Sequence, residues 1–207
     1  MAFYMSNNPL YGFIIRYSLA FMRAQNIFQQ RVGQTIAWGA LTLVLLTTFA
    51  VFLRYAFGFS NAKLDESLLY NHALLFMLGI AYTYQQNQHV RVDVFYARLS
   101  ANHQAWINLI GATLLVLPVM GFILWSGWDY VAASWAVQER SADASGLAYV
   151  YLLKSVILIS AGLVILQTLA LIVQYSLQLF APHALQMDAC AEAFYDNSEK
   201  STTGGGV

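Results

Sequence analysis

Long uncharged stretches of apolar residues alternate with short charged segments along most of the chain. Four of these stretches have about the 20 residues that a helix needs to cross the hydrocarbon core of a bilayer. A charge at the bilayer centre costs about 2.5–3.5 kcal/mol on insertion scales, so the charged residues mark the ends of the spans. The pattern therefore predicts four membrane-spanning helices, at about residues 32–53, 65–84, 104–129 and 147–179.

The regions outside these spans differ in pattern. Residues 1–30 carry apolar side chains at helical spacing with arginines on another face, which predicts an amphipathic helix lying in the membrane surface. Residues 92–99 repeat this pattern, although residues 90–94 also alternate as a strand would. Residues 181–207 are polar and end rich in Gly and Thr, which predicts a disordered tail.

Composition agrees with a lipid-covered surface. The chain is 59% hydrophobic and only 10% charged, whereas a soluble domain carries about 25% charged residues. The net charge is zero, so no basic surplus indicates nucleic-acid binding. A single cysteine, Cys190, excludes an internal disulfide framework and a cysteine-rich metal site. We therefore expect an all-α integral membrane protein with one transmembrane domain, residues 31–180.

Basic residues in the short connecting segments predict the orientation. Five lie on the side of the N-terminus and of the loop between the second and third spans, and three lie on the other side. This bias predicts that both termini are cytoplasmic. The fourth span is longer than a bilayer requires, which predicts that this helix is tilted or projects into the cytoplasm, and we expect four tilted transmembrane helices in all. The two groups are Arg16, Arg23, Arg31, Arg91 and Arg98 against Arg54, Lys63 and Arg140.

Few polar side chains interrupt the predicted spans. His72 is the only histidine within a span, which makes it a candidate proton relay, haem ligand or hydrogen-bonding partner of a neighbouring helix. A membrane haem held by two histidines needs a second one at matched depth on a facing helix. The other three histidines lie outside the spans, so the sequence supplies no second ligand. Pro118, in the third span, predicts a bend.

Lys154 lies about two turns into the fourth span. Its long stem can reach the outer interface, or its ammonium group can contact a carboxylate such as Glu139 or Glu66. Gln167 belongs to a polar stripe that recurs every seven residues of the same span, and we expect it to form an interhelical hydrogen bond. Small residues predict close helix approach at Gly33, Ala37, Ala40 and Gly111.

The sequence contains no nucleotide-binding loop, zinc motif or nucleophile motif, and no span interrupted by paired glycines and prolines. We therefore expect neither an enzyme nor a bound cofactor.

Several short strings narrow the class of membrane protein. They occur in a fixed order over residues 30–180, and the string in the second loop is the most specific. The order and spacing resemble the small membrane subunit (DctQ type) of tripartite ATP-independent periplasmic (TRAP) transporters. The strings are Leu53-Arg54-Tyr55, Asp65-Glu66-Ser67, His89-Val90-Arg91-Val92-Asp93, Glu139-Arg140-Ser141, Leu153-Lys154-Ser155 and Leu166-Gln167.

The resemblance implies a division of labour in a bacterial inner membrane. A large membrane subunit holds the sodium and substrate sites and moves as an elevator, while a periplasmic binding protein delivers the substrate, typically an organic acid. The small subunit braces the large one and contacts phospholipids. The residues expected to contact the partner or lipid are Arg54, Glu66, Arg91, Asp93, Glu139, Ser141, Lys154 and Gln167. The alternatives are a haem-bearing membrane anchor of a redox enzyme and a self-sufficient small carrier.

Overall fold

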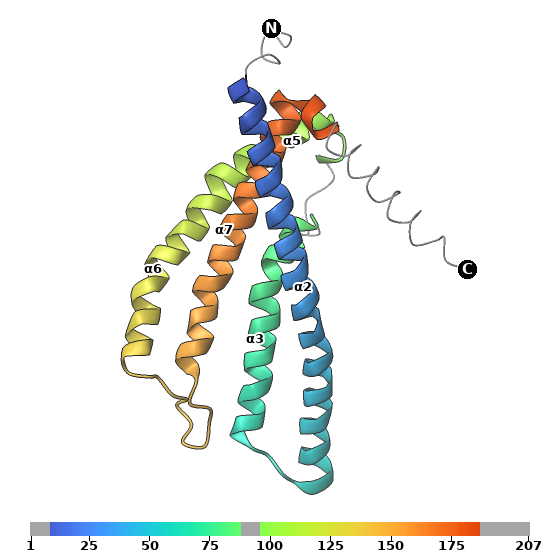
Figure 1. Cartoon of the computed structure of the whole chain (residues 1–207). Coiled ribbons are helices and arrows are strands. Elements are labelled where there is room, and N and C mark those ends of the chain that lie inside the picture. Colours follow the sequence, from blue (N-terminus) through green and yellow to red (C-terminus); the bar gives the residue numbers. More distant parts are fainter. Residues whose placement is uncertain (1–8, 88–95, 187–207) are drawn as a thin grey trace, which may run out of the picture.

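The computed structural model describes residues 9–87 and 96–186, which are helical apart from short connections and contain no strand. The expected all-α fold is confirmed for this part of the chain. Figure 1 shows that the loops at residues 58–61 and 137–149 lie at the same end of the molecule, opposite the N-terminus. In chain order, the elements are α2 (Pro9–Phe57), α3 (Ala62–Gln85), α5 (Ala101–Gly111), the π-helical turn η1 (Ala112–Val116), α6 (Leu117–Ala136) and α7 (Val150–Phe180).

Helix α2 joins the predicted surface segment and the predicted first span without a break. It has 49 residues, which at a rise of 1.5 Å per residue makes it about 73 Å long, more than twice the hydrocarbon core. Arg31 marks a boundary in hydropathy, but a charged residue does not end a helix. The helix ends before Gly58, which has a φ of +64°, a conformation that glycine adopts without steric cost. The placement of its N-terminal part in the membrane surface stays a prediction.

Three helical segments of the described chain are long and apolar enough to cross a membrane: Gly12–Phe57, Ala101–Ala136 and Val150–Phe180. They correspond to the first, third and fourth predicted spans. Helix α3, the second predicted span, has 24 residues and is about 36 Å long. It is less apolar because Asn71, His72 and several tyrosines lie within it.

The third predicted span departs from regular α geometry before Pro118, the residue at which a bend was expected. At η1 the backbone N–H of Leu117 donates to the carbonyl of Ala112, five residues earlier. In a regular α-helix the ring of Pro118 would clash with the carbonyl of Leu114. The wider π-helical turn lies where this clash would occur, and such turns are a recognised cause of helix distortion.

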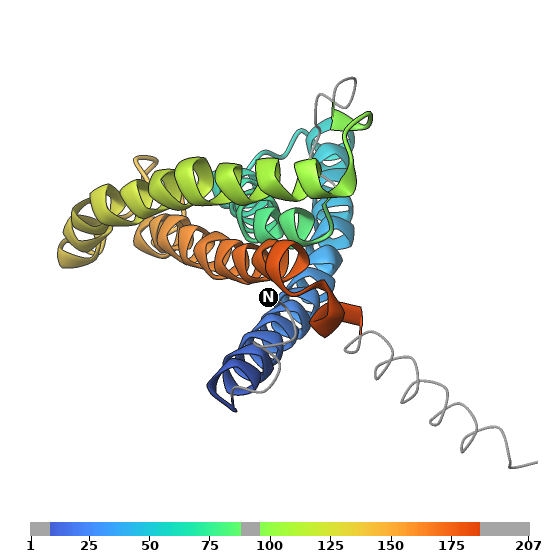
Figure 2. The same cartoon turned by 90° about the horizontal axis from the view of Figure 1, so that it is seen from above.

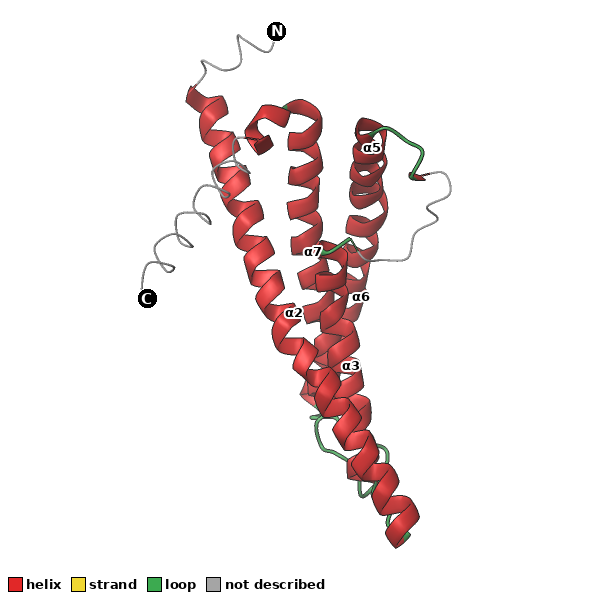
Figure 3. Ribbon diagram, turned by 90° about the vertical axis from the view of Figure 1, so that its right-hand side faces the viewer, coloured by secondary structure: helices red, strands yellow, loops and turns green. Residues whose placement is uncertain are grey.

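Helix α7 is the centre of the packing and touches α2, α3, α5 and α6. In the most apolar stretch of α7 half of the residues are buried, against 6% in those of α2 and of the α5–α6 segment. Viewed from above, α2 crosses the other helices diagonally (Figure 2). Figure 3 shows the same helices from the side, with α2 running almost the full height of the molecule. The outward faces of α2 and α6 are therefore left for lipid or for another protein.

Candidate functional site

Charged side chains gather at the end of the molecule that carries the two loops. The group includes five of the predicted site residues and one further carboxylate, and it connects α2, α3, the loop at residues 137–149 and α7. We call this group the loop-end cluster. Its members are Arg54, Asp65, Glu66, Glu139, Ser141 and Lys154.

Glu66 ties the first turns of α3 to the loop that precedes α7. The Ser141 hydroxyl donates to Glu66 Oε1, and the backbone N–H of Leu147 donates to Oε2 at 2.5 Å. The loop is closed on itself as well, because the Ser141 N–H donates to the Leu147 carbonyl at 3.0 Å. A Cβ added at Gly146 would lie only 2.5 Å from Glu66 Oε1, so a side chain there would overlap the carboxylate. Both carboxylate oxygens thus hold the α6–α7 hairpin against α3, in hydrogen bonds strengthened by charge.

Lys154 finds its partner in Glu139, one of the two carboxylates expected for it. Its Nζ lies 2.5 Å from Glu139 Oε2 and 4.1 Å from the centre of the Tyr130 ring. The hydroxyl of Ser134 donates to the same carboxylate oxygen at 2.6 Å. The hydrogen bonds from Lys154 and then from Ser134 hold the pKa of Glu139 below its ordinary value. The loop-end cluster therefore neutralises the one lysine of α7.

Arg54 pairs with Asp65 across the α2–α3 connection. Its Nη2 lies 3.1 Å from both carboxylate oxygens, and both side chains are about half exposed. An exposed pair of this kind contributes about 0–1 kcal/mol. Two further predicted site residues, Arg91 and Asp93, lie outside the described residues.

Gln167 lies far from these charges, in a second group of polar side chains where α2, α3 and α7 cross. Its Nε2 donates to Asn26 Oδ1 at 3.2 Å, which is the interhelical hydrogen bond expected of it. Gln85, at the end of α3, donates to the Asn26 carbonyl at 2.9 Å. We call Gln25, Asn26, Gln29, Gln85 and Gln167 the amide cluster.

Several amide atoms of this cluster are buried without a hydrogen-bond partner among the described residues. They are Gln25 Nε2, Gln29 Nε2 and Oε1, Gln85 Oε1 and Gln167 Oε1. Gln29 and Gln167 are fully buried. A buried polar group without a partner costs about 1–3 kcal/mol. The hydrogen-bonding groups of the amide cluster are thus less completely paired than the carboxylates of the loop-end cluster.

Comparison with known proteins decides the class. The family described as "Tripartite ATP-independent periplasmic transporters, DctQ component" matches residues 43–177, well over half of the chain. The chain belongs to this family. No curated protein and no solved structure matches it. The resemblance drawn from the short strings is thereby confirmed, and the chain is a small-subunit component of a TRAP transporter.

The matched range of this DctQ-family chain divides its two clusters. All six members of the loop-end cluster lie within residues 43–177, whereas the amide-cluster residues of α2 precede it. Gln25 and Gln29 were not predicted as site residues, because residues 1–30 were expected to lie in the membrane surface. A signal was present, since Gln25, Gln29 and Gly33 recur every four residues and so share one face of a helix.

Close helix approach occurs at only one of the small residues predicted for it. A Cβ added at Gly33 would overlap the ring of Tyr82 on α3, so glycine is required where these two helices meet. Ala37 and Ala40 are exposed, and Gly111 has open space around it. The contact at Gly33 lies one turn from Gln29, which places the closest approach of α2 and α3 next to the amide cluster.

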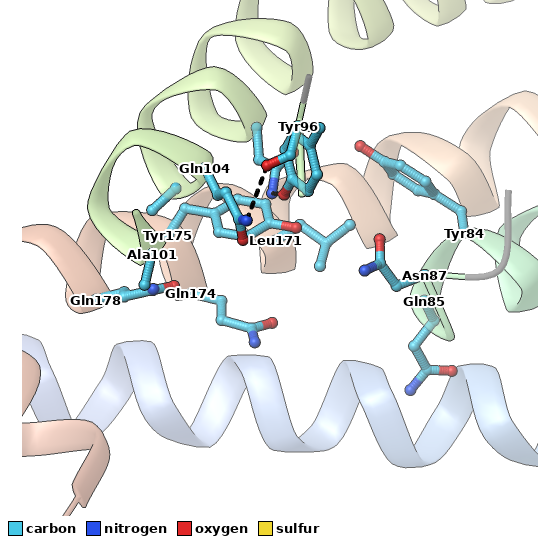
Figure 4. A pocket seen from close by; sticks show the side chains of 12 residues that line it. Tyr84, Gln85, Asn87, Tyr96, Ala101, Gln104, Leu171, Gln174, Tyr175 and Gln178 are labelled. Carbon is cyan, nitrogen blue, oxygen red and sulfur yellow. Dashed lines mark hydrogen bonds between the residues drawn. The ribbon is translucent and has the colours of Figure 1, made fainter. Parts of the chain in front are cut away.

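A cavity of about 240 Å³ lies beside the amide cluster, between the end of α3, α5 and α7. Figure 4 shows amide and tyrosine side chains around it, with Gln104 donating to the Tyr96 carbonyl at 3.0 Å. Gln85 belongs both to the cavity lining and to the amide cluster. The lining residues that the structure describes carry no carboxylate, lysine or arginine.

Proposed function

We propose that this chain is the non-catalytic small permease subunit of a sodium-coupled TRAP secondary transporter in a bacterial inner membrane. It braces a large, elevator-type membrane subunit during uptake of an organic acid delivered by a periplasmic binding protein. Phospholipids cover the remaining apolar surface. The family match supports the transporter class, and the proposal places the sodium and substrate sites in the large subunit.

We further propose that the chain crosses the membrane four times, with both termini cytoplasmic. The connectivity supports the fourth crossing. Helix α2 ends at the loop end of the molecule, whereas the α5–α6 segment begins at the opposite end (Figure 1). If both cross the bilayer from the same side, α3 must return between them. Its length of about 36 Å suffices.

One observation carries the bracing role: Glu66 of α3 binds the loop between α6 and α7 through both carboxylate oxygens. This tie joins the α2–α3 hairpin to the α6–α7 hairpin at the loop end of the molecule. A static wall beside a moving domain has to keep its shape while substrate is carried past it. A bundle tied at its loop end meets this requirement, and the exposed faces of α2 and α6 give it a wide surface in the bilayer.

The experiment is sodium-driven uptake into proteoliposomes. Three preparations are compared: the large subunit together with this chain, the large subunit alone, and this chain alone. The matching binding protein is added outside the proteoliposomes in each case. We expect uptake only when both membrane subunits are present. Equal uptake with and without this chain would contradict the bracing role. Uptake by this chain alone would instead favour the self-sufficient carrier.

The redox-anchor alternative is tested separately by absorbance. The purified chain is expected to show no Soret band, because the family match points to transport rather than to electron transfer. A stoichiometric Soret band would contradict the proposal.

A further inference from the structure

One face of α3 is directed away from the rest of the chain. Asp65, Leu69, His72 and Phe76 are all exposed and follow the spacing of a single helix face. We call these four residues the His72 face. Leu69 is 59% exposed and Phe76 66% exposed, so an apolar surface surrounds the imidazole.

His72 lies deeper in the predicted membrane span than the charged residues at the start of α3. It follows Asp65 by seven residues, which is about 10 Å along a helix, whereas the whole hydrocarbon core is about 30 Å thick. Lys154 lies four residues after the start of α7, and its long side chain reaches Glu139 near the helix end. The short histidine side chain has no comparable reach toward the headgroups.

The imidazole of His72 stacks on Phe76, with 6.3 Å between ring centres, and forms no hydrogen bond to any described residue. Its neighbour Asn71 behaves differently, because its Nδ2 donates to the Gly39 carbonyl of α2 at 3.1 Å. Two polar side chains at the same depth are therefore treated differently, one satisfied within the chain and the other directed outward. Polar groups at this depth ordinarily face protein, since lipid tails offer no hydrogen bond.

We propose that the His72 face docks onto a membrane helix of the large subunit, which presents a hydrogen-bonding group to the His72 imidazole inside the bilayer. This inference rests on the proposed function, which supplies the large subunit as partner. The face has an interface's usual anatomy: Leu69 and Phe76 flank one polar anchor. The Arg54–Asp65 ion pair forms a charged rim at its outer end.

The large subunit is the occupant that the observations favour. Lipid leaves the imidazole unpaired, and family membership places the chain in a transporter of several components rather than in an assembly of identical chains. A second copy of this chain is the other protein that could cover the face, and the experiment distinguishes the two.

The test is photo-crosslinking in the assembled complex. A benzophenone amino acid is introduced separately in place of Leu69 and of Phe76, so that the His72 imidazole is kept. The control site is Trp125, which is 76% exposed on α6. We expect both sites on the His72 face to form adducts with the large subunit, and more of them than the control site forms. Adducts with lipid only, or with a second copy of this chain, would overturn the inference.

Substitution gives a second readout. His72→Phe should lower the fraction of large subunit retained on the tagged chain about three- to tenfold, the range for one interhelical hydrogen bond, while His72→Gln should retain most of it. His103→Phe is the matched control, because His103 is exposed at the start of α5 and contacts Ser100. Equal retention by His72→Phe and the unmodified chain would count against the inference.

Retention of the large subunit by the unmodified chain is measured first. If no complex forms, the proposed function fails and the inference fails with it. If the complex forms and sustains uptake but the His72 face yields no adduct with the large subunit, only the inference is overturned.

Discussion

The loop-end cluster and the amide cluster hold the same bundle by different means. At the loop end, every carboxylate of the cluster has a partner: Asp65 binds Arg54, Glu66 binds Ser141 and Leu147, and Glu139 binds Lys154. In the amide cluster the side chains carry no charge, and five buried amide atoms lack a partner among the described residues.

The difference follows from the cost of charge in a membrane. An unpaired carboxylate or ammonium group is expensive in a low-dielectric setting, so a charge near a span end is favoured when it has a partner. A neutral amide costs less, and an interhelical hydrogen bond in a membrane contributes only about 0.6 kcal/mol on average. We infer that the loop-end cluster supplies stability, while the amide cluster mainly fixes which helix faces meet.

The largest effect is expected from Glu66→Ala. The change removes the hydrogen bonds that the Ser141 hydroxyl and the Leu147 N–H donate to the carboxylate, and a hydrogen bond to a charged group contributes about 1.5–3 kcal/mol. Thermal unfolding of the purified chain in detergent measures the loss as a lower Tm. Asp65→Asn is the matched control. Asp65 is next to Glu66 in the chain, its side chain is about half exposed, and its ion pair with Arg54 contributes about 0–1 kcal/mol. Equal Tm values for the two variants would contradict the claim that the Glu66 hydrogen bonds stabilise the fold more than the Arg54–Asp65 ion pair does.

Gly33→Ala tests the packing beside the amide cluster. The new methyl group would overlap the Tyr82 ring, and overpacking of this kind costs about 1–3 kcal/mol. Gly162→Ala in α7 is the control, since nothing lies within 4 Å of the added Cβ. There the replacement should be neutral or stabilise by about 0.5–1 kcal/mol, because alanine favours helix more than glycine does. Both variants are compared by Tm, and effects of the same sign would contradict the close approach at Gly33.

Lys154→Met tests the ion pair of the loop-end cluster and has a pH signature. Hydrogen bonds lower the pKa of folded Glu139 below its ordinary value of 4.5. The pair therefore stabilises the fold fully above that pH, and its contribution is lost as the pH falls through the lowered pKa. The Tm difference between the unmodified chain and the variant should be largest near neutral pH and shrink below pH 4.5. A difference independent of pH would indicate that only the packing of the lysine stem matters.

The smallest effects are expected from the amide cluster. Gln167→Leu removes one hydrogen bond to Asn26 but also one unpaired oxygen, so a change of about 0.6 kcal/mol or less is expected. Gln29→Leu removes two unpaired atoms and should be neutral or stabilising. A drop in Tm as large as that of Glu66→Ala for either variant would show that the amide cluster is fully paired in the membrane.

The sequence predicted the helices better than the contacts between them. Hydropathy located α3, α7 and the α5–α6 segment, because charged residues near the span ends have a direct physical cost in lipid. It placed a boundary at residue 31 where α2 continues, since hydropathy registers the membrane and not the helix. Glu66, Glu139 and Lys154 were predicted as site residues from the sequence, and Glu139 was one of the two partners expected for Lys154.

The sequence could not predict the Glu66 tie in the same way. Glu66 is separated from Leu147 by 81 positions, and the loop at residues 137–149 has no pattern that shows where it folds back. Gln25 and Gln29 were missed for a related reason. Their burial depends on the diagonal crossing of α2 over α3 and α7, which only the assembled structure reveals (Figure 2).

The central claim is that Glu66 holds the two hairpins together, and the distance between them tests it most directly. Spin labels on exposed residues Tyr55, near the end of α2, and Val137, after α6, report this distance by pulsed electron resonance, with Cys190 replaced by serine. We predict one narrow distance distribution for the otherwise unmodified chain and a broadened or shifted one for Glu66→Ala. Superimposable distributions in the two chains would contradict the account.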